Sequence, residues 1–266
     1  MKKETTSDTT SIWILENNRN ITAGTTRRGI KDKFEDPYAG FSICHYTGDT
    51  HDNIKKCLKL LAEFLSTDTD RIIIPRQTHS ANVHTVTSAN ASDRFPENCD
   101  ALTTDIPGIV IGVNTADCVP VLLYDEERHI VGAAHAGWRG ALNGIIGNTV
   151  NSMIALGSSC TSIHVIICPS IGVECFEVGE EVAELFPEKF VNRLFGIRPH
   201  IDLSRYVQSR LEECGIPEQQ IRQTGICTRC LNSEYFSARI LGTASGRNFS
   251  FIRLNEAPSD VSADYS

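Results

Sequence analysis

Short runs of β-branched residues alternate with amphipathic helical segments along almost the whole chain, and this alternation limits the possible fold more than any other feature. Apolar residues at helical spacing predict helices over residues 52–65, 138–156, 178–185 and 204–214. The β-branched runs predict strands over residues 71–75, 82–86, 110–113, 119–124, 130–134, 163–168, 221–226 and 249–254. Because no linker rich in proline and serine divides them, we expect one α/β domain with a mixed sheet over residues 11–256. Residues 1–10 and 257–266 are expected to be frayed ends.

The composition is that of a globular enzyme and excludes several other classes of protein. Among 266 residues, 25 Lys and Arg stand against 33 Asp and Glu, so a net charge of -8 offers no evident basic surface for nucleic acid. The apolar run at residues 12–15 is too short for a secretion signal or a membrane span. Ten irregularly spaced cysteines indicate free thiols in a reducing compartment. We expect a cytoplasmic monomer without nucleic-acid or membrane partners.

Two neighbouring predicted strands bring a cysteine close to a histidine. If residues 125–128 form the turn of a hairpin with Asp125 opposite Arg128, the numbers of opposed residues add to 253. Cys118 then lies directly opposite His135, with Cβ atoms about 4.5 to 5.5 Å apart. A thiolate and an imidazole at that distance can bind one metal ion or share one proton. On its own, such a pair is more often incidental than functional.

The sequence around this pair favours a functional site. The polar residues 114–117 interrupt two apolar runs, and the small residues around His135 leave space for a ligand. Gly137 and Arg139 lie at the start of the predicted helix, where unpaired N–H groups and the helix dipole attract an anion such as phosphate. His79 follows the strand predicted at 71–75, where a strand end delivers side chains to a site.

Five segments resemble the YfiH-like family, also called the laccase-domain or polyphenol oxidoreductase family. They are Pro75–His79, Cys99–Thr104, Thr115–Leu122, Ala134–Gly140 and Cys227–Thr228. The family includes purine nucleoside phosphorylases and the peptidoglycan editing factor. The resemblance extends from about residue 23 to residue 253, nearly the whole chain.

The resemblance implies a metal site formed by His79, Cys118 and His135, which holds zinc or, alternatively, copper. It implies an α/β sandwich fold, distantly similar to that of toxin cysteine hydrolases. It also implies pocket roles for arginines of the 25–27 and 246–247 segments. The candidate residues for binding a purine nucleoside and phosphate are Arg27, Gln77, Arg139 and Arg247.

Such a donor set suits hydrolytic chemistry. Two imidazoles and one thiolate leave a fourth zinc position for water, whose pKa falls toward ~7. Deamination of adenosine then needs a carboxyl group to carry protons. Asp117 is the first candidate and Asp100 the second, although Asp117 requires a bulge because adjacent strand residues point to opposite faces. The other implied reaction is phosphorolysis of adenosine, inosine or methylthioadenosine to free base and ribose 1-phosphate.

Three alternatives remain at this stage. Cys118 as nucleophile with His135 as base would form a hydrolase for peptidoglycan precursors. A copper-binding polyphenol oxidoreductase is less compatible, because the eight histidines include no His-X-His pair and the only methionines are Met1 and Met153. A metal-binding module without enzymatic activity is the third. The Cys227–Cys230 pair has the spacing of half a zinc ribbon, but without a second such pair we interpret it as packing or pocket wall.

Overall fold

The computed structural model describes residues 11–29, 35–194 and 198–256, so the ends predicted to fray lie outside the described residues. The strands are β1 (Ile12–Asn17), β2 (Ile21–Thr26), β3 (Ile72–Ile73), β4 (Val83–Val86), β5 (Ala101–Thr104), β6 (Val110–Thr115), β7 (Val119–Asp125), β8 (Ile130–Ala136), β9 (His164–Ile167), β10 (Val191–Asn192), β11 (His200–Ile201), β12 (Ile221–Gln223) and β13 (Asn248–Leu254). The helices are α1 (His51–Phe64), α2 (Trp138–Leu142), α3 (Ile145–Ala155), α4 (Glu180–Ala183), α5 (Leu203–Glu213) and α6 (Ala238–Leu241), with single 3-10 turns η2 (Thr69–Arg71), η3 (Glu188–Phe190) and η4 (Glu218–Gln220).

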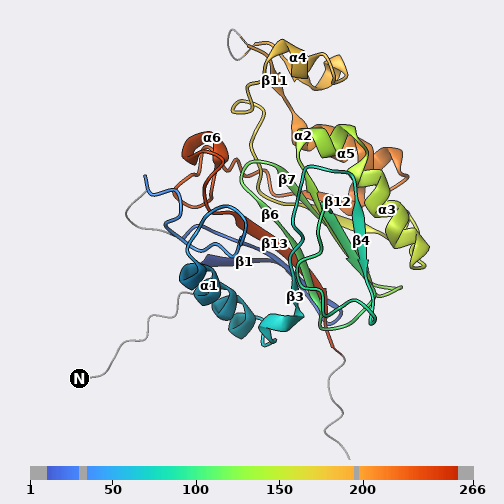
Figure 1. The fold of residues 1–266 in the computed structure, drawn as a ribbon. Coiled ribbons are helices and arrows are strands. Elements are labelled where there is room, and N and C mark those ends of the chain that lie inside the picture. Colours follow the sequence, from blue (N-terminus) through green and yellow to red (C-terminus); the bar gives the residue numbers. More distant parts are fainter. Residues whose placement is uncertain (1–10, 30–34, 195–197, 257–266) are drawn as a thin grey trace, which may run out of the picture.

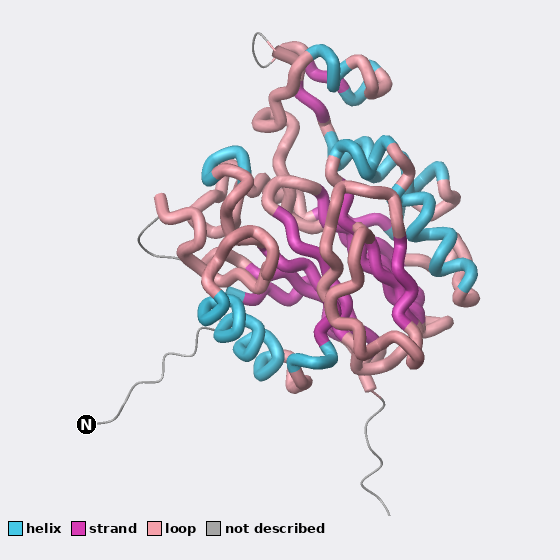
Figure 2. The backbone as a smooth tube through the Cα atoms, in the orientation of Figure 1, coloured by secondary structure: helices cyan, strands magenta, loops and turns pink. Residues whose placement is uncertain are grey.

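The main strands form two mixed sheets that pack face to face. One sheet has the order β1-β2-β13-β6-β3 and the other the order β12-β9-β7-β8-β5-β4. Helix α1 covers the outer face of the first sheet, and α2, α3 and α5 cover the outer face of the second (Figures 1 and 2). The result is the α/β sandwich that the family resemblance implied. The single mixed sheet expected from the pattern of strands and helices is divided into two sheets.

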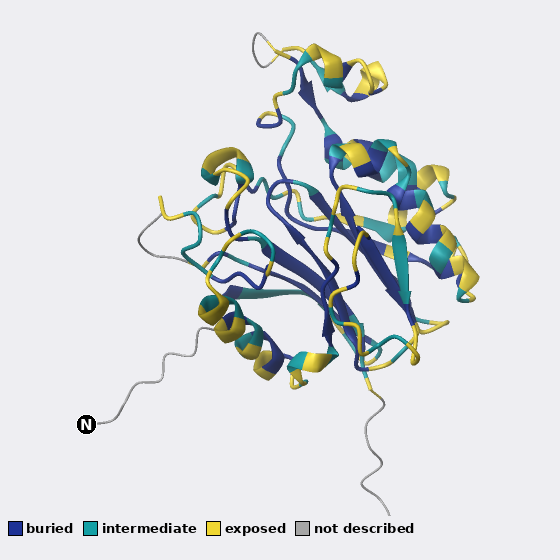
Figure 3. Cartoon of the chain, in the orientation of Figure 1, coloured by how far each residue is buried: buried dark blue, intermediate teal, exposed yellow. Residues whose placement is uncertain are grey.

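Both faces of the central strands are buried, which explains why their sequences are continuously apolar. In β7, Val121 and Leu123 pack against the helical layer, whereas Leu122 packs against the other sheet. Every residue of β7 and β8 is buried (Figure 3). Such strands read as apolar runs without alternation, because neither face meets water. No helix in the part of the chain that the structure describes is long and apolar enough to span a membrane.

The β7–β8 hairpin corrects the predicted register. Its loop is two residues longer than expected: Asp125 is opposite Ile130, and its carboxylate accepts the backbone N–H groups of Glu127 and Arg128 at 3.1 and 3.0 Å. His135 is consequently opposite Pro120 and not Cys118. Because a shift of two residues preserves the face of a strand, position 118 still projects to the side of the sheet on which His135 lies.

The long helix predicted over residues 138–156 is two helices. Gly144 has a φ of 92°, which lies in the left-handed region and ends α2 before α3 begins. The predicted end at residue 156 agrees with the C-cap residue Leu156 of α3, which is followed by Gly157 with a φ of 113°. The N-terminal hairpin β1–β2 and strand β5 were not predicted. The apolar run at residues 12–15 forms most of β1, but it was considered only as a secretion signal or membrane span. Strands β2 and β5 consist mainly of Thr, Ala and Gly and have no clear apolar run or alternation.

Candidate metal centre

The second sheet brings four separate segments to one of its edges. His79 and Asp100 precede β4 and β5, Cys118 precedes β7, and His135 lies near the end of β8. Strands β4 and β5 are parallel, while β5 and β7 are both antiparallel to β8. The starts of β4, β5 and β7 and the end of β8 therefore share an edge, and the strand order makes these four segments neighbours.

The three residues implied as metal ligands meet at this edge. One ligand atom from each of His79, Cys118 and His135 lies within 4.8 Å of the other two. The two imidazole rings are 4.9 Å apart between centroids and nearly perpendicular, at 78°. His135 is buried, Cys118 is half-buried and His79 is exposed, so the cluster opens to solvent on the His79 side. Two nitrogen donors and one sulfur donor with an open side fit a catalytic zinc site better than a closed structural one.

Asp100 organises two of the three ligands. Its Oδ1 lies 2.8 Å from Nδ1 of His135. Because the carboxylate accepts a hydrogen bond from Nδ1–H, the ring proton is on Nδ1 and Nε2 can bind a metal. Its two oxygens also accept the backbone N–H groups of Thr78, His79 and Ser80 at 3.1, 3.0 and 2.7 Å. His79 has a φ of 60°, an unfavourable conformation that these bonds help to hold. Burial opposes ionisation, but the hydrogen bond and charge of His135 lower the pKa of Asp100 to about 2.

Gly137 forms the wall behind the cluster. A Cβ at this position would lie 2.9 Å from Cδ2 of His79 and 3.1 Å from Sγ of Cys118. We predict that Gly137→Ala lowers zinc affinity at least about tenfold by displacing these ligands, while its φ of -69° suits alanine and preserves the fold. Competition with a chromogenic chelator measures the affinity. Gly147→Ala is the control, because its Cβ would meet no atom closer than 3.9 Å, and equal affinities in the two variants would contradict the prediction.

Cys118 and His135 form a charged pair when no metal is bound. Burial alone would raise the pKa of the Cys118 thiol, but the charge and hydrogen bond of His135 lower it from 9.0 to about 6. Although burial acts the other way, the thiolate and Asp100 raise the pKa of His135 to about 9. Between these values the pair is thiolate and imidazolium.

The pair leads to a prediction for the metal-stripped protein. Alkylation of Cys118 by iodoacetamide should increase with pH around a midpoint near 6, because only the thiolate reacts. His135→Gln should move the midpoint upward, since the stabilising positive charge is removed. Mass spectrometry of the peptide containing Cys118 follows both reactions, and a wild-type midpoint above about pH 8, the ordinary range of a thiol, would contradict the assignment.

Asp117 lies beside the cluster with its carboxylate already occupied. The residue has a φ of 84°, so the chain does depart from regular strand geometry there. Its Oδ1 accepts the Thr228 hydroxyl at 2.7 Å, and its Oδ2 accepts the Ser237 hydroxyl and the backbone N–H of Arg239 at 3.1 and 2.7 Å. Of the two carboxyl groups proposed as proton carriers from the sequence, Asp100 is the one that contacts His135.

The candidate substrate-binding residues differ in how far their polar groups are engaged. Gln77 bonds the backbone of Asn114 through both amide atoms at 2.8 Å, and its Oε1 also accepts the Tyr46 hydroxyl. Arg247 donates to carbonyl groups of its own loop, at residues 243, 245 and 246. Arg27 stacks over Trp13 and is 3.7 Å from Glu234.

Arg139 is exposed and lies over the Trp138 ring, two residues after the glycine that backs the cluster. Sequence reasoning missed Arg28, the fully buried neighbour of Arg27. Its guanidinium donates to the carbonyl oxygens of residues 36, 39 and 232 and so joins distant loops. A buried arginine gives no local signal in a sequence that distinguishes it from a solvent-exposed one.

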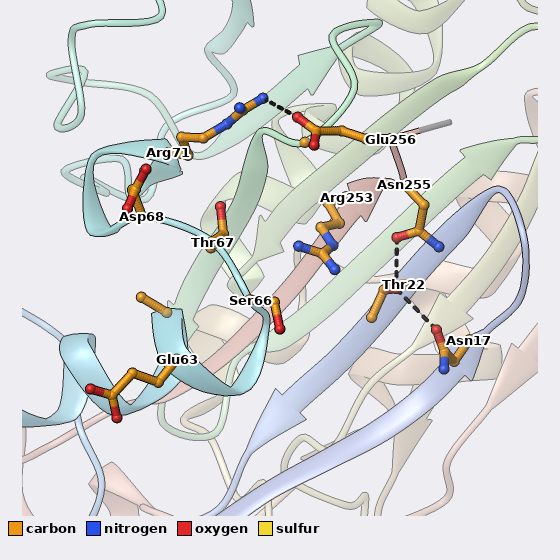
Figure 4. Close-up of a pocket in the computed structure, with 12 residues that line it drawn as sticks. Asn17, Thr22, Glu63, Ser66, Thr67, Asp68, Arg71, Arg253, Asn255 and Glu256 are labelled. Atoms are coloured by element: carbon orange, nitrogen blue, oxygen red, sulfur yellow. Dashed lines mark hydrogen bonds and ion pairs between the residues drawn. The ribbon is translucent and has the colours of Figure 1, made fainter. Parts of the chain in front are cut away.

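A cavity of about 630 Å³ lies at a different place in the fold (Figure 4). Arg71 pairs with Glu256 at its wall, and Arg253 donates to the Leu65 carbonyl. The cavity wall includes Gly108, just before β6, whereas Gln77 contacts Asn114 near the other end of β6. The length of β6 therefore separates this cavity from the candidate metal centre.

Comparison with known proteins places the chain in a family. The sequence pattern of the family described as multi-copper polyphenol oxidoreductase laccase matches residues 22–255. The chain belongs to this laccase-domain family. It is 37% identical over 245 residues to adenosine deaminase RL5 from an unknown prokaryotic organism, covering 87% of this chain and 93% of that protein. It is 35% identical over 246 residues to a purine nucleoside phosphorylase of Bacteroides thetaiotaomicron, covering 87% and 90%.

Solved structures of the laccase-domain family have the same fold. The hypothetical protein YfiH of Bacillus licheniformis superimposes with a TM-score of 0.82 at 31% identity, covering 88% of this chain and 93% of that chain. YlmD of Geobacillus stearothermophilus gives 0.81 at 26% identity, covering 92% and 100%. These matches confirm the family resemblance and the sandwich fold that the sequence motifs implied.

Proposed function

We propose that this protein is a zinc-dependent purine nucleoside enzyme. Its reactions would be phosphorolysis of adenosine, inosine or methylthioadenosine and deamination of adenosine. The observation that carries the proposal is the meeting of two imidazoles and one thiolate within 4.8 Å, with an open side. The substrate class is supported by relatives named adenosine deaminase and purine nucleoside phosphorylase.

In this proposal His79, Cys118 and His135 hold the ion. Bound zinc would supply a Lewis acid and a water molecule with a pKa near ~7. Asp100 acts as a positioning residue, because it fixes the ring of His135 and the turn that carries His79. Asp117 is the proposed proton carrier for deamination, a role in which substrate would replace one of the three donors on its two oxygens.

Phosphate would bind near Arg139. This guanidinium is exposed, close in sequence to the wall of the cluster and free of the backbone bonds that engage Arg247. Arginine suits phosphate because its planar group donates two parallel hydrogen bonds. Gln77 would act by holding Asn114 beside the His79 segment.

The direct test is a panel of purine nucleosides assayed by chromatography with and without phosphate. Ribose 1-phosphate that forms only with phosphate identifies phosphorolysis, and ammonia with inosine identifies deamination of adenosine. Removal of zinc by a chelator should abolish both activities, and added zinc should restore them. No turnover of any purine nucleoside by the zinc-loaded protein would refute the proposal.

A second candidate function is favoured by the thiolate–imidazolium pair. The Cys118 thiolate would attack an amide carbonyl of a peptidoglycan precursor, and the His135 imidazolium would give its proton to the departing amine. Neutral His135 would then take a proton from the water that hydrolyses the thioester and frees the thiolate. Metal dependence separates the two proposals. Amide cleavage that survives chelation but is lost after alkylation of Cys118 would support the hydrolase.

A further inference from the structure

A second group of thiols gathers at the same sheet edge, outside the candidate metal centre. Sγ atoms of Cys175, Cys227 and Cys230 lie within 4.8 Å of one another, and those of Cys175 and Cys230 are 3.4 Å apart. The sequence offered only the Cys227–Cys230 pair. The fold adds a third sulfur from a segment more than fifty residues away.

The sheet explains why these segments meet. Strands β9 and β12 are parallel neighbours, so the chain leaves both at the same edge. Beyond them, the N–H of Ser170 donates to the Ile226 carbonyl at 3.2 Å, and the N–H of Thr228 donates to the Ser170 carbonyl at 3.0 Å. These backbone bonds fix the two segments side by side, so the sulfurs are brought together before any ion binds.

Two donors point at the sulfur atoms. The backbone N–H of Gly172 lies 3.2 Å from Sγ of Cys227, and Nη1 of Arg229 lies 3.4 Å from Sγ of Cys175. Cys175 belongs to the buried apolar cluster under the helical layer, and Cys227 packs against that cluster. The backbone N–H and the guanidinium nevertheless give two of the sulfurs polar neighbours, which suit the negative charge that a sulfur carries when it binds a metal.

The spacing and exposure suit a zinc ion. Zinc bonds sulfur at about 2.3 Å, which places the sulfurs of a tetrahedral site about 3.8 Å apart. Cys175 is buried, Cys227 is half-buried and Cys230 is exposed, so a fourth position would face solvent. Three thiolates also select zinc over hard cations such as magnesium and calcium.

We propose that Cys175, Cys227 and Cys230 form a second metal site, which takes a zinc ion through three thiolates. The ion would join the segments after β9 and β12. Both segments reach the residue before Cys118: Thr228 donates to the Asp117 carboxylate, and the N–H of Ile171 donates to the Asp117 carbonyl. Zinc here would therefore brace the candidate metal centre from outside, whichever reaction that centre performs.

Zinc stoichiometry tests the proposal. Full-length protein is reduced, stripped of metal, reconstituted anaerobically with zinc sulfate, desalted and measured by mass spectrometry for zinc per chain. We expect two zinc ions in the wild type, one in Cys118→Ser and one in the double variant Cys175→Ser, Cys230→Ser. The control is Cys160→Ser with Cys214→Ser, which removes two half-buried thiols elsewhere and should retain two ions.

Cobalt identifies the ligands at each site. The near-ultraviolet charge-transfer band grows with each cobalt–sulfur bond, and only one of four such bonds belongs to the candidate metal centre. Replacing all three thiols by serine should remove about three-quarters of the band, and Cys118→Ser about one-quarter. Should the serine variants fold poorly, the wild type and Cys118→Ser decide the question alone.

Several results would overturn this second site. One is a wild type that binds a single zinc ion together with a Cys118→Ser variant that binds none. Another is a triple variant that keeps the full cobalt band. A third is peptide mapping that finds Cys175 joined to Cys230 by a disulfide in protein kept under reductant. Loss of nucleoside turnover is not a readout here, so this test and that of the proposed function fail independently.

Discussion

Replacing Cys118 by alanine is expected to lower purine nucleoside turnover at least about a hundredfold while the protein stays folded. The thiol supplies one of three ligand atoms, and even residues that only orient ligands typically contribute 10- to 100-fold. The Cys118 side chain is half-buried and lies just before β7, at the end of the sheet. Its truncation should therefore leave the packing of the buried sheets and helices unchanged. Initial rates, zinc content and thermal unfolding are measured together on one preparation.

The control removes a thiol of similar burial from another place. Cys160→Ala truncates a half-buried thiol that packs against the helical layer, and it should retain both activity and one zinc ion at the candidate centre. Full nucleoside turnover in Cys118→Ala would eliminate the metal mechanism, because that mechanism depends on this sulfur. A loss of nucleoside turnover with unchanged zinc content would also contradict it, because the sulfur would then contribute without holding the ion.

The layered fold was predictable from the sequence because burial on both faces leaves a strong local signal. Strand β7 reads as an apolar run. Helix α1 has apolar residues on the face toward the sheet, including the buried Cys57, Leu61 and Ala62, and its charged residues lie on the opposite face. Such patterns need no knowledge of distant residues. What they cannot give is the pairing of strands, which is why the two sheets and their order had to come from the structure.

The residues of the candidate site could be predicted from the sequence, but the contacts among them could not. The hairpin register was displaced by two residues, because the Asp125 carboxylate caps a longer loop than the sequence indicates. The error did not separate Cys118 from His135, since the period of a strand is two. Asp100 was ranked below Asp117, because its contact with His135 arises only when β5 pairs with β8.

The thiol cluster shows the same limit more strongly. Cys227 and Cys230 are separated by only two residues, and their spacing could be recognised in the sequence. Cys175 joins them only because β9 and β12 are parallel neighbours, in which Ile221 pairs with Val165. Long-range contacts of this kind are set by tertiary packing, which local patterns do not encode.

Asp100→Asn is expected to damage both stability and metal binding. The carboxylate accepts the N–H groups of residues 78–80, the Ser80 hydroxyl and the His135 ring, and an amide with one acceptor oxygen cannot replace it. Each buried donor left without a partner costs about 1–3 kcal/mol. We expect a loss of about 3 kcal/mol or more in the free energy of unfolding and a 10- to 100-fold loss in zinc affinity.

The stabilisation that the Asp100 carboxylate provides should be lost at low pH. Because the folded-state pKa of Asp100 is about 2, against 3.8 ordinarily, the group stabilises the fold fully above about pH 4. This contribution of about 2–3 kcal/mol is lost as the pH falls through about 2. The metal-stripped Asn variant should lack that part of the acid transition, which denaturant titrations at a series of pH values would reveal.

Asp125→Asn distinguishes a positioning role from a merely structural one. Asp125 is also a buried carboxylate with several donors, including Ser158 and the backbone of Glu127, but it lies at the far end of β7. Burial alone would raise its pKa, yet its hydrogen bonds from Ser158 and Ser162 lower the pKa below the usual value. Both variants should therefore be less stable, while only Asp100→Asn should bind zinc more weakly. Equal zinc affinity in the two variants would remove Asp100 from the metal centre, because it would mean that His135 and the His79 turn keep their geometry without the carboxylate that now holds them.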